Sequence, residues 1–246
     1  MDSGSTTTKA IVVRDHEIVA YKIIPTGFDF VKAAEAAYRE VLGDIGESEI
    51  SGIYATGYGR NSIGFALKSV SEITAHAKGA HFLFPEAQGV IDIGGQDSKV
   101  IAVDAGGVTE FLMNDKCAAG TGKFLEHTAR ALEVPIEELG RLAIASKSPA
   151  AITSMCTVFA ESEVISLRSR GFLKEDIAAG LIQSIASRVA VMARQAGVGR
   201  SVALVGGVAK NAGVRAMLEK ELGIALYVPA EPQITGALGA ALFGIK

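Results

Sequence analysis

Residues 2–13 read Asp-Ser-Gly-Ser-Thr-Thr-Thr-Lys-Ala-Ile-Val-Val, and residues 92–103 read Asp-Ile-Gly-Gly-Gln-Asp-Ser-Lys-Val-Ile-Ala-Val. The two stretches align without a gap, and five of their twelve positions are identical: Asp2/Asp92, Gly4/Gly94, Lys9/Lys99, Ile11/Ile101 and Val13/Val103. Each copy has the pattern of a β-hairpin, in which a strand ends in an acidic residue, a Gly/hydroxyl turn follows, and an alternating apolar strand returns. Two such hairpins 90 residues apart predict two similar halves that face each other.

Outside the repeat, short Val/Ile-rich runs alternate with longer segments of helical periodicity. The short runs predict strands at Ile91–Ile93, Lys99–Val103, Val108–Met113 and Val202–Val205. Apolar residues at three- and four-residue spacing predict helices at Val31–Leu42, Gly122–Leu132, Val158–Leu167, Ile177–Gln195 and Gly213–Leu222. Strands mixed with helices in this way indicate the α/β class.

Charge, apolar runs and cysteine content indicate where in the cell the protein is expected. A net charge of -3 gives no reason to expect nucleic acid or an anionic membrane as a partner. We find no apolar run of the roughly eighteen residues that a membrane span needs. The first residues, Met1 to Gly4, lack the basic end and apolar stretch of a secretion signal, and two cysteines make no disulfide framework. These features favour a cytoplasmic protein.

The turns of both hairpins are rich in groups that bind phosphate, because small residues allow close approach of backbone N–H groups. The predicted contacts come from Ser5, Thr6, Thr7, Thr8 and Lys9 in the first turn and from Gly94, Gly95 and Gln96 in the second. Either turn alone has an ordinary explanation, since Gly, Asp and Ser favour turns anyway. The matched pair favours a nucleotide held from two sides.

Acidic and amide side chains beside these turns suit the chemistry of phosphate hydrolysis. Asp2, Asp92 and Asp97 are placed to hold Mg²⁺ directly or through water, since Mg²⁺ prefers one or two carboxylates plus phosphate oxygens and waters. Gln96 is suited to orient a hydrolytic water. We therefore predict Gln96, Asp92 and Asp97 as the catalytic residues.

Two further glycine clusters occur near the C-terminal end. Gly206 and Gly207, with Lys210 after them, follow a predicted strand and open a helix, which suits adenosine or phosphate at a helix N-terminus. A strand-to-helix turn also often needs glycine for packing alone. Residues 236–241 form a small-residue helix that either packs closely against another element at a hinge or lies in a tight core.

Cys117 and Cys156 each stand shortly before a helical pattern, with candidate caps at Asn114 or Asp115 and at Ser154. A helix N-terminus favours thiolate and therefore metal or redox chemistry. Spacing alone favours two small buried hydrophobes, the usual fate of free cysteine. Two thiolates cannot complete a four-thiolate iron–sulfur site, but two copies of the chain about a two-fold axis can. The four histidines, at 16, 76, 81 and 127, show no ligand spacing and are predicted to be surface or structural residues.

Several runs resemble one known family, the activator ATPases (component A) of 2-hydroxyacyl-CoA dehydratases, of the BadF/BadG/BcrA/BcrD type. These proteins are related to the ATP-binding subunits of benzoyl-CoA reductase. The runs that carry the resemblance are 4–6, 55–62, 91–97, 114–122, 156–166, 206–211 and 236–241. Those around the cysteines are especially specific, because actin-like sugar kinases lack them.

The resemblance implies the fold shared by acetate kinase, sugar kinases, heat-shock chaperones and actin, in which ATP lies between two ribonuclease-H-like domains. The expected limits are residues 1–88 plus 236–246 for the first domain and 89–235 for the second. It also implies a homodimer with one 4Fe–4S cluster at its interface, ligated by Cys117 and Cys156 of each copy.

Carried over residue by residue, the resemblance assigns the phosphates to Ser5 through Lys9 and to Gly94 through Gln96. Glu126 is expected at the ribose or base, with position 210 and Gln233 on the adenosine side. Position 210 is Lys here, where the family is expected to have Gln. Relatives are also expected to have several more apolar residues before Asp2, so we expect a shortened first strand and a weakened first phosphate turn.

The implied function is that of an anaerobic, ATP-dependent electron carrier. A ferredoxin or flavodoxin would supply the electron, and a 2-hydroxyacyl-CoA dehydratase or related reductase would receive it. Two alternatives of the same fold stay open: a small-molecule kinase of the amino-sugar type, and a non-catalytic actin-like assembly ATPase. Residues 166–172 are either a docking loop or, more in keeping with their composition, a solvated basic turn.

Overall fold

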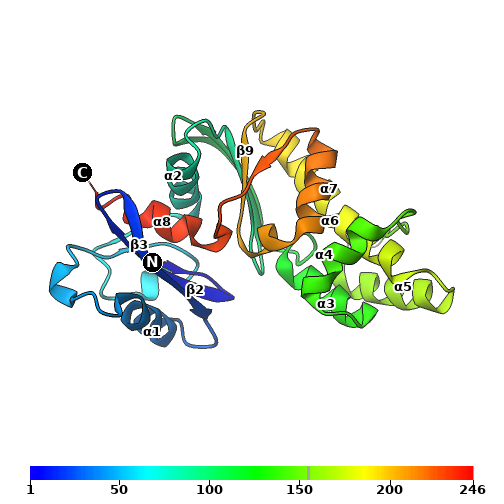
Figure 1. Cartoon of the computed structure of the whole chain (residues 1–246), viewed down its shortest axis with the longest axis horizontal. Helices are drawn as coiled ribbons and strands as arrows, with labels where there is room; N and C mark the ends of the chain where they lie inside the picture. The colour runs from blue at the N-terminus through cyan, green and yellow to red at the C-terminus, as the bar shows by residue number, and fades with distance from the viewer. Residues whose placement is uncertain (154–155, 246) are drawn as a thin grey trace.

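The computed structural model describes residues 1–153 and 156–245, and it has the predicted α/β architecture (Figure 1). The first sheet has the order β1-β2-β3, formed by β1 (Asp2–Ser3), β2 (Thr7–Arg14) and β3 (Glu17–Pro25). The second has the order β10-β9-β6-β7-β8, formed by β6 (Gly89–Ile93), β7 (Ser98–Asp104), β8 (Gly107–Asn114), β9 (Val202–Val205) and β10 (Leu226–Tyr227). A small parallel pair joins β4 (Tyr54–Ala55) to β5 (Lys68–Ser69).

The repeated sequence forms two hairpins of the same register, as predicted. Asp2 pairs with Lys9 across β1 and β2, and Asp92 pairs with Lys99 across β6 and β7, both antiparallel. The first strand of each hairpin also has a parallel neighbour on its other side. Asp2 bridges to Thr56, and Asp92 pairs with Val205 in the same way. The similarity of the halves therefore extends beyond the matching sequence.

Every helix predicted from the apolar spacing is present, and the observed ends differ from the predicted ends by at most three residues. They are α1 (Phe30–Leu42), α2 (Glu72–Leu83), α3 (Gly122–Leu132), α4 (Ile136–Ala145), α5 (Thr157–Ser169), α6 (Lys174–Gln195), α7 (Ala212–Leu222) and α8 (Thr235–Ala241). The sequence did not predict α2, α4 or β3. The α2 segment has few large apolar side chains, α4 has a central glycine, and most of β3 is exposed rather than alternating in burial.

Both faces of the second sheet are buried, by different sets of helices (Figure 1). Ile91, Ile93 and Leu204 belong to a large core with α3 to α7, whereas Val90, Ile101 and Val205 pack with α2. Among the described residues, α6 is long and apolar enough to cross a membrane by length and composition, although no such run was expected. Because 61% of its apolar window is buried, its apolar character is accounted for by this core.

Two helices join the halves at a close crossing. Ala77 and Ala80 of α2 pack on the second sheet, and Leu238 of α8 packs on Ile11 of the first. A Cβ atom on Gly239 would overlap the backbone of Ala75, so glycine is required for this approach. The small-residue helix is thus a close-packing element between the halves. The predicted domain limits put α2 with the first half; it packs on the second sheet through Ala77 and Ala80 and on α8 through Ala75 and Gly79.

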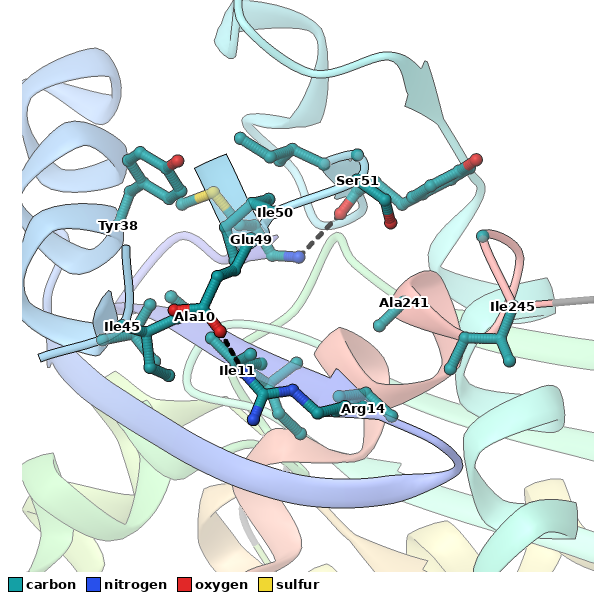
Figure 2. A pocket seen from close by; sticks show the side chains of 18 of the residues that line it. Ala10, Ile11, Arg14, Tyr38, Ile45, Glu49, Ile50, Ser51, Ala241 and Ile245 are labelled. Atoms are coloured by element: carbon teal, nitrogen blue, oxygen red, sulfur yellow. Dashed lines mark hydrogen bonds and ion pairs between the residues drawn. The ribbon is translucent and has the colours of Figure 1, made fainter. Parts of the chain in front are cut away.

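A groove of about 320 Å³ lies beside β1, between β2 and residues 50–54 (Figure 2). The Met1 nitrogen donates to the Tyr54 carbonyl at 2.6 Å inside it, and Arg14 pairs with Glu49 at 2.7 Å across it. When the two hairpins are compared, this groove lies where the second hairpin has the first residues of β6. β1 has two residues, whereas β6 has five.

The helix crossing gives a stability prediction. Replacing Gly239 by Val should destabilise the fold by about 3 kcal/mol, at the upper end of overpacking costs, because the new side chain meets backbone that cannot yield. Urea unfolding followed by circular dichroism measures the effect. Ala145→Val, on an exposed position of α4, is the matched control and should change little. Equal stability of the two variants would contradict the close crossing.

Candidate functional site

A cleft of about 670 Å³ opens between the two hairpin turns. It collects nearly all of the predicted nucleotide and catalytic residues on its walls: Ser5, Thr6, Thr7, Lys9, Asp92, Gly94, Gly95, Gln96, Asp97, Glu126, Gly206, Gly207, Lys210 and Gln233. These residues come from strands and loops far apart in the sequence. Their convergence is what the matched hairpins predict.

Thr8 is the exception, and its predicted phosphate contact is not supported by its position. Its side chain is fully buried, and its Oγ1 lies 2.9 Å from Oγ1 of Thr26. Successive strand residues point to opposite faces, so Thr7 and Lys9 line the cleft while Thr8 points away from it. Thr26 in turn donates to the Gly4 carbonyl at 2.7 Å, so Thr8 supports the first turn from behind.

The two turns approach each other directly. A Cβ atom on Gly95 would overlap the side chain of Thr6, which belongs to the opposite hairpin. Within the described residues, the Thr6 hydroxyl oxygen is buried and has no hydrogen-bond partner. Buried polar groups are normally satisfied, so this hydroxyl is one of the few unpaired polar groups among the described residues, and it lies at the junction of the turns.

Lysines neutralise the acids at the base of the cleft. Lys9 lies 3.0 Å from Asp2, and Lys99 lies 3.3 Å from Asp92 and 2.7 Å from Asp97. Glu72 of α2 adds a further contact to Lys99 at 2.9 Å. Each buried carboxylate is therefore balanced by an ammonium group, which offsets the cost of removing charge from water.

The ion pairs keep these buried groups charged. Burial alone raises the pKa of Asp92, but the nearby His76, Lys99 and Lys9 charges lower it below its usual value. Burial likewise lowers the pKa of Lys99, but Asp92, Asp97 and Glu72 together hold it well above its usual value. In the part of the chain that the structure describes, no group of three or more His, Cys, Asp or Glu side chains forms a ready metal site.

Glu72 and His76, both on α2, are cleft residues that the sequence analysis missed as site residues. Nδ1 of His76 lies 2.9 Å from the Glu72 carbonyl, and Nε2 lies 3.6 Å from Asp92. The ring is buried and fits against Gly236 of α8, in keeping with a structural histidine. No spacing signal points to either residue, because their partners lie on other elements.

Glycine and polar residues form the opposite wall. Gly206 has φ of +85°, and a Cβ atom there would overlap Asp92, so this turn requires glycine. Lys210 lies 2.8 Å from Glu231, and Glu126 lies 2.7 Å from Lys123. The lysine at position 210 is thus held by a carboxylate at the cleft wall rather than left without a partner.

Cys117 lies in the loop before α3, and Cys156 lies directly before α5; these two helices pack against each other. Cys156 is exposed and is the N-cap residue of α5. Cys117 is half-buried and packs against the large core between the second sheet and helices α3 to α7. The candidate cap Ser154 lies outside the described residues. The alternative of two buried hydrophobes is wrong for Cys156, which is open to solvent.

Two alike halves that close on one cleft, each with a phosphate-type turn, define an actin-like ATPase. A ROK family glucokinase from Streptomyces griseus, solved with glucose and AMPPNP, shares this fold with a TM-score of 0.60 at 14% identity, a likeness in fold alone. The chain belongs to the BadF/BadG/BcrA/BcrD ATPase family, whose model matches residues 1–244. It is therefore an ATPase that binds ATP and ADP.

Two members of the family are similar over nearly their whole length. The (R)-2-hydroxyglutaryl-CoA dehydratase activating ATPase of Acidaminococcus fermentans is 48% identical over 100% of this chain and 96% of its own. The crystal structure of that component A matches with a TM-score of 0.95 over 98% of this chain and 95% of that one. The activator of 2-hydroxyisocaproyl-CoA dehydratase from Clostridium difficile, solved with bound ADPNP, is 43% identical with a TM-score of 0.92 over 98% and 91%.

The buried lysine supplies a test of the cleft's electrostatics. Lys99→Met should destabilise the protein by about 3–5 kcal/mol, because it leaves buried carboxylates without a partner. The pKa of Asp92 is lowered on folding, so its contribution is present above its unfolded value of about 4 and lost as pH falls through the folded value. Denaturant unfolding at pH 7 measures the loss.

Lys32→Met is the matched control, because Lys32 pairs with Asp29 at 3.6 Å on an exposed face of α1. Its stability should be close to that of the unaltered protein, since exposed pairs contribute little. A Lys99→Met variant as stable as this control would show that the acids of the cleft do not depend on Lys99.

Proposed function

We propose that this ATPase is an electron-transfer activator that uses ATP to deliver a low-potential electron to a 2-hydroxyacyl-CoA dehydratase or a related reductase. One observation carries the proposal: the nucleotide cleft is lined by Asp115 and Lys116, the residues directly before Cys117. A kinase or assembly ATPase has no use for a cysteine at this place. Relatives named as dehydratase activators share almost the whole chain.

The proposed nucleotide position follows from the donors on each wall. Ser5, Thr6, Thr7 and Lys9 would contact the phosphates from the first half, and Gly94 to Gln96 from the second. Glu126, Lys210 and Gln233, together with Gly206 and Gly207, would hold the ribose and base. The orphaned Thr6 hydroxyl supports this placement, since a phosphate oxygen would satisfy it.

Hydrolysis is assigned to the acidic end of the cleft. Mg²⁺ would be held through water by Asp92 and Asp97, because their carboxylates are already paired with Lys99. Gln96 would orient the attacking water toward the terminal phosphate. The γ-phosphate can be contacted by both turns together only when the halves are close, so ATP and ADP would favour different arrangements.

The donor set around the cysteines fits a shared iron–sulfur cluster. An exposed Cys156 and a half-buried Cys117 supply two thiolates, and a second copy would supply the other two. A 4Fe–4S cluster so held would carry one electron at low potential between donor and acceptor. The exposed position of Cys156 at the N-cap of α5 leaves it accessible to a second protomer.

The remaining partners are inferred from this role. A ferredoxin or flavodoxin would supply the electron, and closure about the α2–α8 crossing would accompany docking to the dehydratase. Residues 166–169 of the basic segment are the last turn of α5, so the expected solvated turn is confined to residues 170–172. Arg168 pairs with Glu133 at 2.8 Å and donates to the Ala131 carbonyl at 2.6 Å, which gives it a structural role rather than one in docking.

Iron analysis tests the proposal. Protein purified without oxygen should be brown, contain about four irons per dimer, and lose them on either Cys117→Ser or Cys156→Ser, since a 4Fe–4S site needs all four thiolates. Ser162→Ala, on the same helix as Cys156, is the control and should keep its iron. A colourless, iron-free dimer with full ATPase activity would rule out the cluster, and phosphorylation of an amino sugar would favour the kinase.

A further inference from the structure

The segment between β8 and α3, residues 115–121, is here called the cysteine loop because Cys117 lies within it. Asn114, the last residue of β8, holds this loop from one side. Its Nδ2 donates to the carbonyl of Cys117 at 2.9 Å and to the carbonyl of Ala119 at 2.8 Å. One amide group thus uses both of its N–H bonds on the backbone of the cysteine loop.

The other end of the cysteine loop is attached to the second phosphate turn. The Gly122 amide donates to the Gly94 carbonyl at 2.9 Å, and the Lys123 amide donates to the Gly95 carbonyl at 2.8 Å. These amides belong to the first turn of α3, where backbone donors would otherwise lack partners inside the helix. Movement of Gly94 and Gly95 must therefore carry the start of α3 with it or break both bonds.

Asn114 returns to the same phosphate turn by a second route. In the β7–β8 ladder it pairs with Ser98, the residue that ends the turn. Inside the loop, the Thr121 hydroxyl donates to the Ala118 carbonyl at 2.7 Å, and this hydrogen bond stabilises a tight turn. The cysteine loop is a compact unit fixed at both ends to residues 94–98.

We propose that Asn114 is a positioning residue that couples the nucleotide state of the second phosphate turn to the placement of Cys117. The inference rests on the proposed function and deepens it. Without the two side-chain bonds, the start of α3 still follows Gly94 and Gly95, but Cys117 is no longer held to β8. Nucleotide binding would then move the turn without a matching change at the thiol, because the coupling requires a continuous set of contacts.

Thiol reactivity in iron-free protein tests this coupling apart from any electron transfer. In a Cys156→Ser background, Cys117 is the sole thiol, and its rate of reaction with 5,5′-dithiobis(2-nitrobenzoic acid) is measured with and without MgATP. The parent should show a several-fold change in rate on MgATP binding. Asn114→Ala and Asn114→Asp should react about tenfold faster without nucleotide and lose most of the MgATP effect, as expected for two lost hydrogen bonds.

Asn114→Asp keeps the shape of the side chain but cannot donate, so it separates the hydrogen bonds from packing. ATP affinity, measured by calorimetry, should stay within about twofold in both variants, since Asn114 does not line the cleft. Thr109→Ala, on an exposed position of β8, is the control and should behave as the parent.

Outcomes separate the two proposals. The role of Asn114 is overturned if MgATP changes the thiol reaction rate of Asn114→Asp as much as that of the Cys156→Ser parent. It is also overturned if MgATP binds the parent without changing its rate. Unaltered protein that purifies free of iron in the absence of oxygen overturns the proposed function instead. If neither variant folds, amide hydrogen exchange in the unaltered protein decides: MgATP must change the exchange of residues 94–98 and 115–121 together, and a change confined to the phosphate turn contradicts the coupling.

Discussion

Two buried aspartate–lysine pairs are the constraint from which the rest of this structure follows. Asp2 and Asp92 each lie one residue before the end of a strand at the base of the cleft, and each is neutralised by the lysine directly across its hairpin. Beside each pair a glycine at positive φ, Gly57 or Gly206, leaves room for the carboxylate. A side chain at either position would push against the acid and separate the strands that form the cleft.

This arrangement shows why part of the site was predictable and part was not. The spacing from aspartate to lysine fixed the register of both hairpins, and alternation along a strand explains why Thr7 faces the cleft and Thr8 does not. The contact of Glu72 with Lys99 joins elements with no shared pattern in sequence, so only the three-dimensional structure gives it. Helix α2 was missed because small or polar residues dominate it, and α4 was missed because a central glycine interrupts its short apolar pattern.

The same constraint connects the nucleotide to the cysteines. Both phosphate turns meet at Thr6 and Gly95, so a ligand there touches both halves of the molecule. The second turn continues through backbone hydrogen bonds into α3 and through β7 and β8 into Asn114. The halves also meet at the close-packed crossing of α2 and α8 at Gly239.

A crystal structure of the protein with Mg²⁺ and a non-hydrolysable ATP analogue would show whether both hairpins bind the same nucleotide. We expect the terminal phosphate to be contacted by the first turn, at Ser5 to Thr7, and by the second, at Gly94 to Gln96, in the same molecule. Phosphates bound by one turn alone, or a nucleotide seated outside the cleft, would contradict the claim that the twin hairpins close on a single ligand.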